Sequence, residues 1–209
     1  ENPVDLAAFK EYASVLLSVN EERDCNVKIM STGKDFVVYL SKKFYPGPAY
    51  YEKGIRTACI QIERPSPNAK IRRSDYIERI ETFKQANEIF EALLMNAEGY
   101  LTEGSKSNLF FVRRGEPDAV YTAPREMVLE GIMRQYVLDL CGQENISVKF
   151  EPIRYSALGD VEALFITGTS INVLPIAKVD EIQYNSPENS TVLRIMHAFQ
   201  NYIDTITKG

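Results

Sequence analysis

Short apolar segments of strand length, separated by turn signals and interrupted by helical segments, follow one another along this chain without a regular strand–helix–strand order. Residues 90–95 and 100–102 are two such segments, and the turn sequence Asn-Ala-Glu-Gly at 96–99 joins them. Residues 163–167 are apolar almost throughout, which is typical of a strand covered on both faces. This irregular mixture predicts an α+β fold in preference to a doubly wound α/β sheet.

The positions of helices and strands follow from hydrophobic spacing and from turn residues. The spacing predicts helices over residues 3–19, 74–87, 131–141 and 189–206, and Gly142 is expected to end the third. Strands are predicted at residues 27–29, 36–40, 55–62, 90–95, 100–102, 109–112, 120–122, 148–150, 163–167 and 173–179. Residues 43–54 contain two prolines, two glycines and four aromatic residues, and we interpret them as an irregular linker.

Composition and charge argue against several classes of protein. The 209 residues are 44% hydrophobic, which is enough for a real core, and the net charge of −5 offers no attraction to nucleic acid or to an anionic membrane. No apolar run approaches the length of a transmembrane helix. The three cysteines are widely spaced and form no C-x-x-C pair, so we expect neither a zinc site nor a disulfide framework. A reducing cytoplasm is the expected location.

Histidine chemistry is nearly excluded, because the sequence has one histidine, His197, inside the predicted final helix. A Ser-His-Asp apparatus or a histidine metal site is therefore not expected, and no metal site is predicted. The sequence also lacks a Walker loop and a G-x-G-x-x-G motif. An enzyme with this composition must rely on a carboxylate, a lysine or a cofactor.

The segment richest in candidate groups is residues 100–112, Tyr-Leu-Thr-Glu-Gly-Ser-Lys-Ser-Asn-Leu-Phe-Phe-Val. It reads as a strand, a polar turn and a second strand. The turn places the carboxylate of Glu103 and several small hydrogen-bonding side chains at one edge of a sheet. By composition alone, a hydrogen-bonded turn without further function is the better interpretation of this segment.

Three stretches, in order and at the right spacing, give the chain a resemblance to the class IV aminotransferases. Residues 99–108, Gly-Tyr-Leu-Thr-Glu-Gly-Ser-Lys-Ser-Asn, are similar to the signature stretch of that family. Residues 130–135 resemble its Gly-Ile-x-Arg helix start, and residues 164–170 with 174–176 resemble its late strand and loop. The family includes branched-chain aminotransferases, D-amino-acid aminotransferases and aminodeoxychorismate lyases. The resemblance spans roughly residues 55–180.

The resemblance implies the D-amino-acid aminotransferase-like fold and a division of the chain into domains. Residues 1–42 would be the remnant of a small N-terminal domain, 43–54 the interdomain linker and 55–209 the large domain that binds pyridoxal 5'-phosphate. Members of the family carry more of the small domain, including a phosphate-binding arginine, ahead of the matched region. The chain begins with Glu-Asn-Pro, and we expect this fragment to bind cofactor weakly and to be inactive, whereas the intact gene product is expected to be active.

The resemblance also assigns a Schiff-base lysine. In the family this lysine lies a little more than thirty residues before the signature glutamate, and Lys70 lies 33 residues before Glu103. Lys84 is the competitor, but it lies only 19 residues before Glu103 and on a predicted helix. The proline-containing loop 64–70 follows a predicted strand, and such a rigid edge favours a desolvated amine with a lowered pKa. We therefore assign Lys70 to the cofactor.

The remaining cofactor contacts are carried over in the same way. Glu103 would face the pyridine nitrogen and keep the ring protonated, and Lys70 would remove the α-proton of the substrate. Ile132 and Met133, at the start of the predicted helix 131–141, would give backbone N–H groups to the phosphate. Thr169 would give the phosphate its hydroxyl and its N–H group.

The resemblance implies transamination between an amino acid, branched-chain or similar, and a 2-oxo acid. The pyruvate-releasing aminodeoxychorismate lyase is the alternative, because residues 131–135 are closer to the lyase and residues 102–108 to the transaminases. A catalytically inactive fragment is the second alternative. A homodimer is expected, with the aromatic residues of 44–51 offering apolar surface for the interface.

Overall fold

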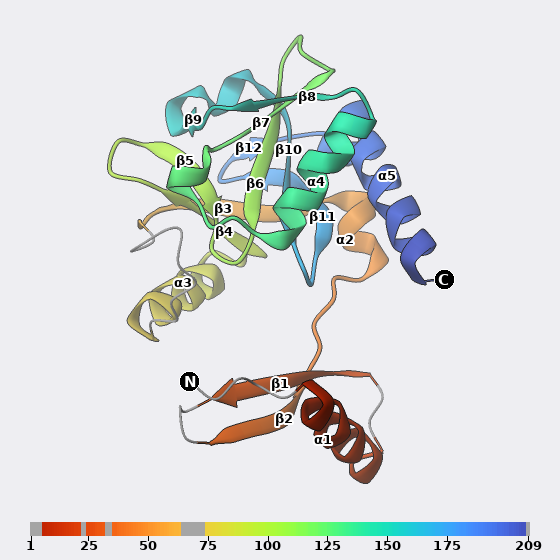
Figure 1. Ribbon diagram of the computed structural model, residues 1–209. Helices are drawn as coiled ribbons and strands as arrows, with labels where there is room; N and C mark the ends of the chain where they lie inside the picture. Colours follow the sequence, from red (N-terminus) through yellow and green to blue (C-terminus); the bar gives the residue numbers. More distant parts are fainter. Residues whose placement is uncertain (1–5, 22–23, 32–34, 64–73, 208–209) are drawn as a thin grey trace. The chain divides into compact units, whose positions relative to one another are not determined.

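The computed structural model describes residues 6–21, 24–31, 35–63 and 74–207. The chain divides into two compact units, residues 1–45 and 46–209 (Figure 1). The division falls inside the segment 43–54 that the sequence reading treats as a linker.

The first unit contains one helix and one hairpin. Helix α1 (Leu6–Val19) is followed by the antiparallel strands β1 (Cys25–Ser31) and β2 (Phe36–Lys42), which pair along their whole length from Cys25 with Lys42 to Ser31 with Phe36. Helix α1 contacts β2. The hairpin predicted at residues 27–29 and 36–40 is thus confirmed, with longer strands.

The second unit is built on a ten-stranded sheet. Its strands are β3 (Ile55–Gln61), β4 (Glu91–Met95), β5 (Tyr100–Gly104), β6 (Asn108–Arg113), β7 (Ala119–Thr122), β8 (Ser147–Phe150), β9 (Ile153–Arg154), β10 (Val161–Gly168), β11 (Asn172–Val179) and β12 (Ile182–Gln183). Six of them pair in a ring, β6-β10-β11-β3-β4-β5, because β5 pairs again with β6. The sheet is therefore closed like a barrel, with β7 and β8 extending it from β6.

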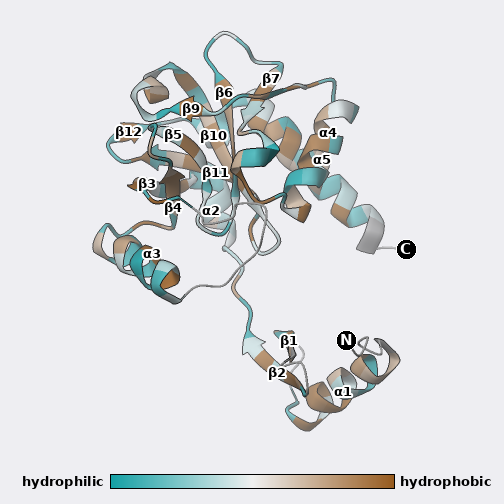
Figure 2. Cartoon of the chain, turned by 60° about the vertical axis from the view of Figure 1, so that its left-hand side comes forward, coloured by the Kyte–Doolittle hydropathy of each residue, from teal (hydrophilic) through white to brown (hydrophobic). Residues whose placement is uncertain are grey.

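Helices cover the outside of this ring. They are α2 (Pro48–Lys53), α3 (Ser74–Ala86), α4 (Ile132–Gln143) and α5 (Ser190–Thr207), with 3-10 turns η1 (Arg125–Met127), η2 (Tyr155–Asp160) and η3 (Ser186–Glu188). Helices α4 and α5 lie side by side against the sheet in Figure 1 and contact each other. Figure 2 shows hydrophobic residues along the strands and both hydrophobic and hydrophilic residues on α3.

The alternation of side chains along each strand divides the core into separate clusters. Leu164 and Ile166 of β10 belong to one cluster, whereas Ala163 and Phe165 belong to a second cluster together with residues of α4 and α5. Both faces of β10 are covered, and its apolar run at 163–167 is the consequence. A third, smaller cluster joins Ile80 of α3 to β4.

Three predictions of secondary structure were wrong. Residues 48–53, assigned to an irregular linker, form α2, because Pro48 is compatible with a first helical turn. Gly142 does not end α4, which continues to Gln143; Asn145 takes the left-handed conformation, with φ +55°, and Ile146 N–H bonds back to the Cys141 carbonyl at 2.8 Å. The two-residue strands β9 and β12 were missed because they are too short for a periodic pattern.

Candidate functional site

Glu103 is a buried carboxylate at the end of β5. Its side chain is 2% exposed, and its Cα pairs across the sheet with Asn108, the first residue of β6. Glu103 Oε2 accepts hydrogen bonds from Asn108 Nδ2 at 3.4 Å and from the Leu129 N–H at 3.2 Å. The fold therefore holds this acid against two neutral donors from two other parts of the chain.

Asn108 connects this carboxylate to the start of α4. Its Nδ2 also donates to the Leu129 carbonyl at 2.7 Å. A Cβ atom at Gly131 would overlap Asn108 Oδ1, so only glycine allows this close approach. Gly131 is the residue that precedes α4, and no side chain caps the helix there. Asn108 thus brings the positive end of α4 next to the strand pair that carries Glu103.

Ile132 and Met133 form the first turn of α4, as the sequence predicts. The Ile132 side chain is 67% exposed, whereas Met133 is buried against the sheet. Backbone N–H groups at a helix start have no acceptor within the helix, so this turn can bind an anion.

Thr169 lies exposed in the turn after β10. Within β10, Thr167 pairs with Asn108, so Thr169 lies just beyond the same sheet edge as Glu103. A Cβ atom at Gly168 would lie 3.5 Å from the Lys106 carbonyl oxygen, in the turn between β5 and β6. The topology therefore brings Glu103, the start of α4 and the Thr169 turn to one edge of the barrel.

Lys70 lies outside the described residues, so the structure gives no position for it. The competing Lys84 lies in the last turn of α3, so its predicted position on a helix is confirmed.

Arg134 carries a buried guanidinium group for which the sequence predicted no role. It is 3% exposed, and its Nη2 donates to the Ala123 carbonyl at 2.9 Å. Burial lowers the pKa of Arg134, and the charges of Glu130 and Glu103 act in the opposite direction. The arginine in the Gly-Ile-x-Arg motif was the available signal. Arg134 gives the buried acid Glu103 a nearby positive charge.

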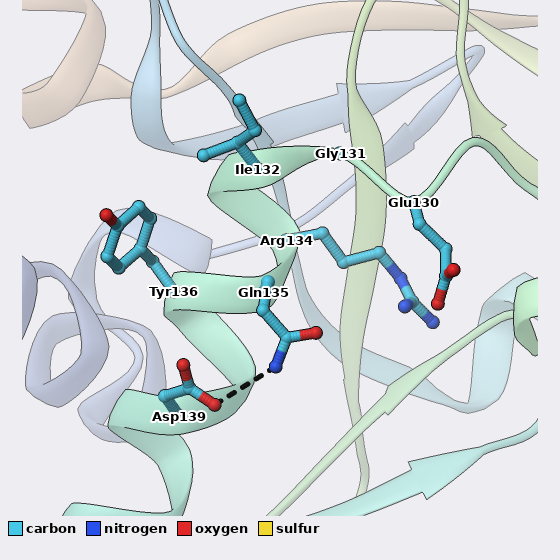
Figure 3. A pocket seen from close by; sticks show the side chains of 7 residues that line it. All are labelled: Glu130, Gly131, Ile132, Arg134, Gln135, Tyr136 and Asp139. Carbon is cyan, nitrogen blue, oxygen red and sulfur yellow. Dashed lines mark hydrogen bonds between the residues drawn. The ribbon is translucent and has the colours of Figure 1, made fainter.

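An open hollow of about 520 Å³ lies along the first turns of α4 (Figure 3). Figure 3 shows the side chains of Arg134 and Glu130 extending to one side of the helix and those of Ile132 and Tyr136 to the other. Gln135 Nε2 donates to Asp139 Oδ1 at 3.0 Å, and both residues line the hollow. The lining residues are Glu130, Gly131, Ile132, Arg134, Gln135, Tyr136 and Asp139. The start of α4 is thus accessible from outside.

The part of the chain that the structure describes contains neither a candidate metal-ion cluster nor a candidate membrane-spanning helix. Within those residues, no group of three or more His, Cys, Asp or Glu side chains is arranged to hold a metal ion. None of the described helices is both long enough and apolar enough to cross a membrane.

The chain is similar to proteins of one family. The model of the family described as amino-transferase class IV matches residues 1–179. A probable branched-chain-amino-acid aminotransferase of Aquifex aeolicus (strain VF5) is 34% identical over 110 residues, which cover 52% of this chain and 35% of that protein. The chain spans less than half the length of the curated relatives it matches.

Solved structures share the fold. The branched-chain amino acid aminotransferase from Escherichia coli superposes with a TM-score of 0.74 at 21% identity, covering 95% of this chain and 73% of that one. A putative 4-amino-4-deoxychorismate lyase from Legionella pneumophila gives 0.74 at 16% identity, covering 96% and 78%. Another branched-chain amino acid aminotransferase, with a TM-score of 0.76, is complexed with N-(5'-phosphopyridoxyl)-L-glutamate. The predicted α+β, class IV aminotransferase fold is therefore confirmed. The barrel-like closure of its sheet is a finding of the structure.

Proposed function

The chain belongs to the amino-transferase class IV family, and from this premise we propose that it is the cofactor-binding part of a pyridoxal-phosphate-dependent aminotransferase. The reaction is transfer of an amino group between an amino acid, branched-chain or similar, and a 2-oxo acid. The observation that carries the proposal is the arrangement of Glu103, which is buried and bonded to the Leu129 N–H just before α4. A carboxylate and a helix N-terminus at one sheet edge suit the two ends of this cofactor.

The residues present fit pyridoxal 5'-phosphate. When bound, this group delocalises the electron pair left when an amino acid loses its α-proton. Asn108 and the Leu129 N–H orient the Glu103 carboxylate by hydrogen bonds. So oriented, Glu103 would hold a proton at the pyridine nitrogen of the bound cofactor.

Donors of two elements would hold the phosphate. Ile132 and Met133 would give backbone N–H groups at the positive end of α4, and Thr169 would give its hydroxyl and N–H group from the turn after β10. The closeness of the Gly168 and Lys106 backbones supports placing this turn beside the site. One donor set thus begins a helix and the other directly follows a strand.

Lys70 holds the cofactor covalently and takes the α-proton from the substrate. The test is to reduce the cofactor-loaded protein with borohydride and to identify the modified peptide. Lys70→Ala is expected to abolish both the yellow absorbance and the modification, whereas Lys84→Ala is expected to retain both. Modification at Lys84, or a yellow Lys70→Ala protein, would contradict the assignment.

The substrate class is tested with a panel of amino acids. Branched-chain amino acids are expected to yield their 2-oxo acids, because sequence relatives described as branched-chain aminotransferases support this class. Pyruvate release from aminodeoxychorismate, without amino transfer, would favour the lyase instead. A fully loaded protein that forms neither the 2-oxo acid nor pyruvate would be an inactive member.

We propose further that the protein acts as a homodimer in the cytoplasm. Phe44, Tyr45 and Tyr50 expose 62%, 53% and 44% of their surface, and aromatic groups of this kind occur in interface cores. The described cysteines are free thiols, which suit a reducing compartment. Sedimentation tests the dimer, and a strictly monomeric protein would refute it. Cell fractionation tests the cytoplasmic location.

A further inference from the structure

Glu91, the first residue of β4, is a second buried carboxylate to which the proposed chemistry gives no role. Its side chain is 4% exposed. Oε1 accepts hydrogen bonds from the Ala92 N–H at 2.9 Å and from the Ser105 hydroxyl at 2.5 Å. Oε2 accepts from the Ser107 hydroxyl at 3.2 Å and from the Lys106 N–H at 3.4 Å. Three of the four donors belong to the turn between β5 and β6.

The turn around this carboxylate is tightly packed. The Gly104 N–H bonds to the Ser107 carbonyl at 2.8 Å, and the Ser105 N–H bonds to the Ala92 carbonyl at 2.9 Å. A Cβ atom at Gly104 would overlap the Ser107 hydroxyl and lie 3.2 Å from Glu91 Cγ. Ser105 and Ser107 are each 5% exposed. In an exposed turn these donors would bond to water; in this buried turn they bond to the Glu91 carboxylate.

The two ends of the same turn carry the site. Glu103 precedes it and Asn108 follows it, and these two residues pair with each other. The Lys106 carbonyl at its tip approaches Gly168, next to Thr169. A displacement of the turn would thus move the ring-nitrogen acceptor, and it would also disturb the packing beside a phosphate donor.

We propose that Glu91 is a positioning residue that fixes the β5–β6 turn and so sets the contact between Glu103 and the cofactor ring nitrogen. This inference rests on the proposed function. Burying a carboxylate is unfavourable unless its oxygens are well hydrogen-bonded, and here four donors satisfy them. Glutamine has the same shape, but its amide nitrogen donates and cannot accept hydrogen bonds. In place of one Glu91 oxygen it would face N–H and O–H donors that then lack an acceptor.

The test compares Glu91→Gln with Glu98→Gln, which changes an exposed glutamate in the preceding turn. Each variant is made in the intact gene product and loaded with pyridoxal phosphate labelled with ¹⁵N at the ring, and the ¹⁵N chemical shift is followed against pH. In Glu91→Gln the ring nitrogen is expected to lose its proton about one pH unit lower, because its acceptor is misplaced. kcat should fall by about tenfold, with KM for the amino acid nearly unchanged. Glu98→Gln should match the parent.

The outcomes separate this proposal from the function on which it rests. An unchanged ring-nitrogen titration and kcat in a loaded Glu91→Gln protein, even one of lower Tm, would overturn the positioning role alone. A parent protein that binds no cofactor would overturn the proposed function and this inference with it. If Glu91→Gln does not fold, Ser107→Ala removes one donor to Oε2 and should shift the titration in the same direction by a smaller amount. An unshifted titration there would equally overturn the role.

Discussion

Two successive short turns of the barrel, residues 96–99 between β4 and β5 and residues 105–107 between β5 and β6, have opposite surroundings. In the first turn, Ala97 and Glu98 are exposed. In the second, Ser105 and Ser107 are buried around the Glu91 carboxylate. A short chain reversal is therefore exposed at one position and is part of the proposed site at the other.

The conformation of the first turn is set by its own asparagine and glycine. Asn96 Oδ1 accepts from the Tyr100 N–H at 2.8 Å, and the Gly99 N–H bonds to the Asn96 carbonyl at 3.1 Å. Gly99 has φ +81°, a left-handed conformation that glycine adopts without strain, and a Cβ atom there would meet nothing within 4 Å. Its own sequence therefore predicts this turn. More distant residues add hydrogen bonds at its exposed surface: the Ala97 N–H donates to Glu63 Oε1 at 2.9 Å, and Arg154 Nη1 donates to the Glu98 carbonyl at 3.1 Å.

The second turn surrounds a buried carboxylate, whereas the carboxylate bonded to the first turn, Glu63, is exposed. Glu91 lies 14 residues from Ser105 and 16 from Ser107. Gly104 has no left-handed conformation to explain it, and it is glycine because Ser107 and Glu91 leave no room for a Cβ atom. The difference teaches that glycine in a turn can reflect either backbone conformation or packing.

The largest expected effect comes from removing the acid that precedes the second turn. Glu103→Gln should retain cofactor binding, because the phosphate donors remain, but turnover should fall by about 100-fold or more as the ring nitrogen loses its proton. Steady-state kinetics on the loaded protein measures this. Glu98→Gln, in the first turn, is the matched control and should keep parental turnover. An unchanged kcat in Glu103→Gln would reduce the second turn to a structural one.

An alanine at each glycine separates the two causes. Gly104→Ala should lower the free energy of unfolding by about 1–3 kcal/mol through overpacking, and it should lower kcat as well. Gly99→Ala should cost about 1–2 kcal/mol through backbone strain and leave kcat unchanged. Urea unfolding and kinetics on both proteins make the comparison. Equal kcat values in the two variants would show that the crowding at Gly104 is not connected to the site.

The smallest expected effect lies in the first turn. Asn96→Ala removes the hydrogen bond to the Tyr100 N–H and should cost about 0.5–1.5 kcal/mol of stability. Activity should stay at the parental level, since the contacts of Glu103 are made elsewhere. A loss of kcat beyond about twofold, outside the error expected for a local change, would break the distinction between the two turns.

Much of the fold could be read from local sequence because its signals are local. The apolar run at 163–167 predicted β10, and the turn sequence at 96–99 predicted the β4–β5 hairpin. The left-handed Asn145 that replaces Gly142 as the end signal of α4 was missed, because either residue can adopt that conformation and the packing chose between them.

The sequence by itself determined most of the strand and helix segments, the closely spaced Glu103-to-Asn108 motif and the order of motifs that places the chain in its family. Only the tertiary structure decided that Glu103 would pair with Asn108, that β5 would close the ring onto β6, and that Glu91 and Arg134 would be buried charges. The physical reason is that hydrophobic period and turn propensity act between near neighbours. Burial of a charge depends instead on donors that distant parts of the chain bring to it.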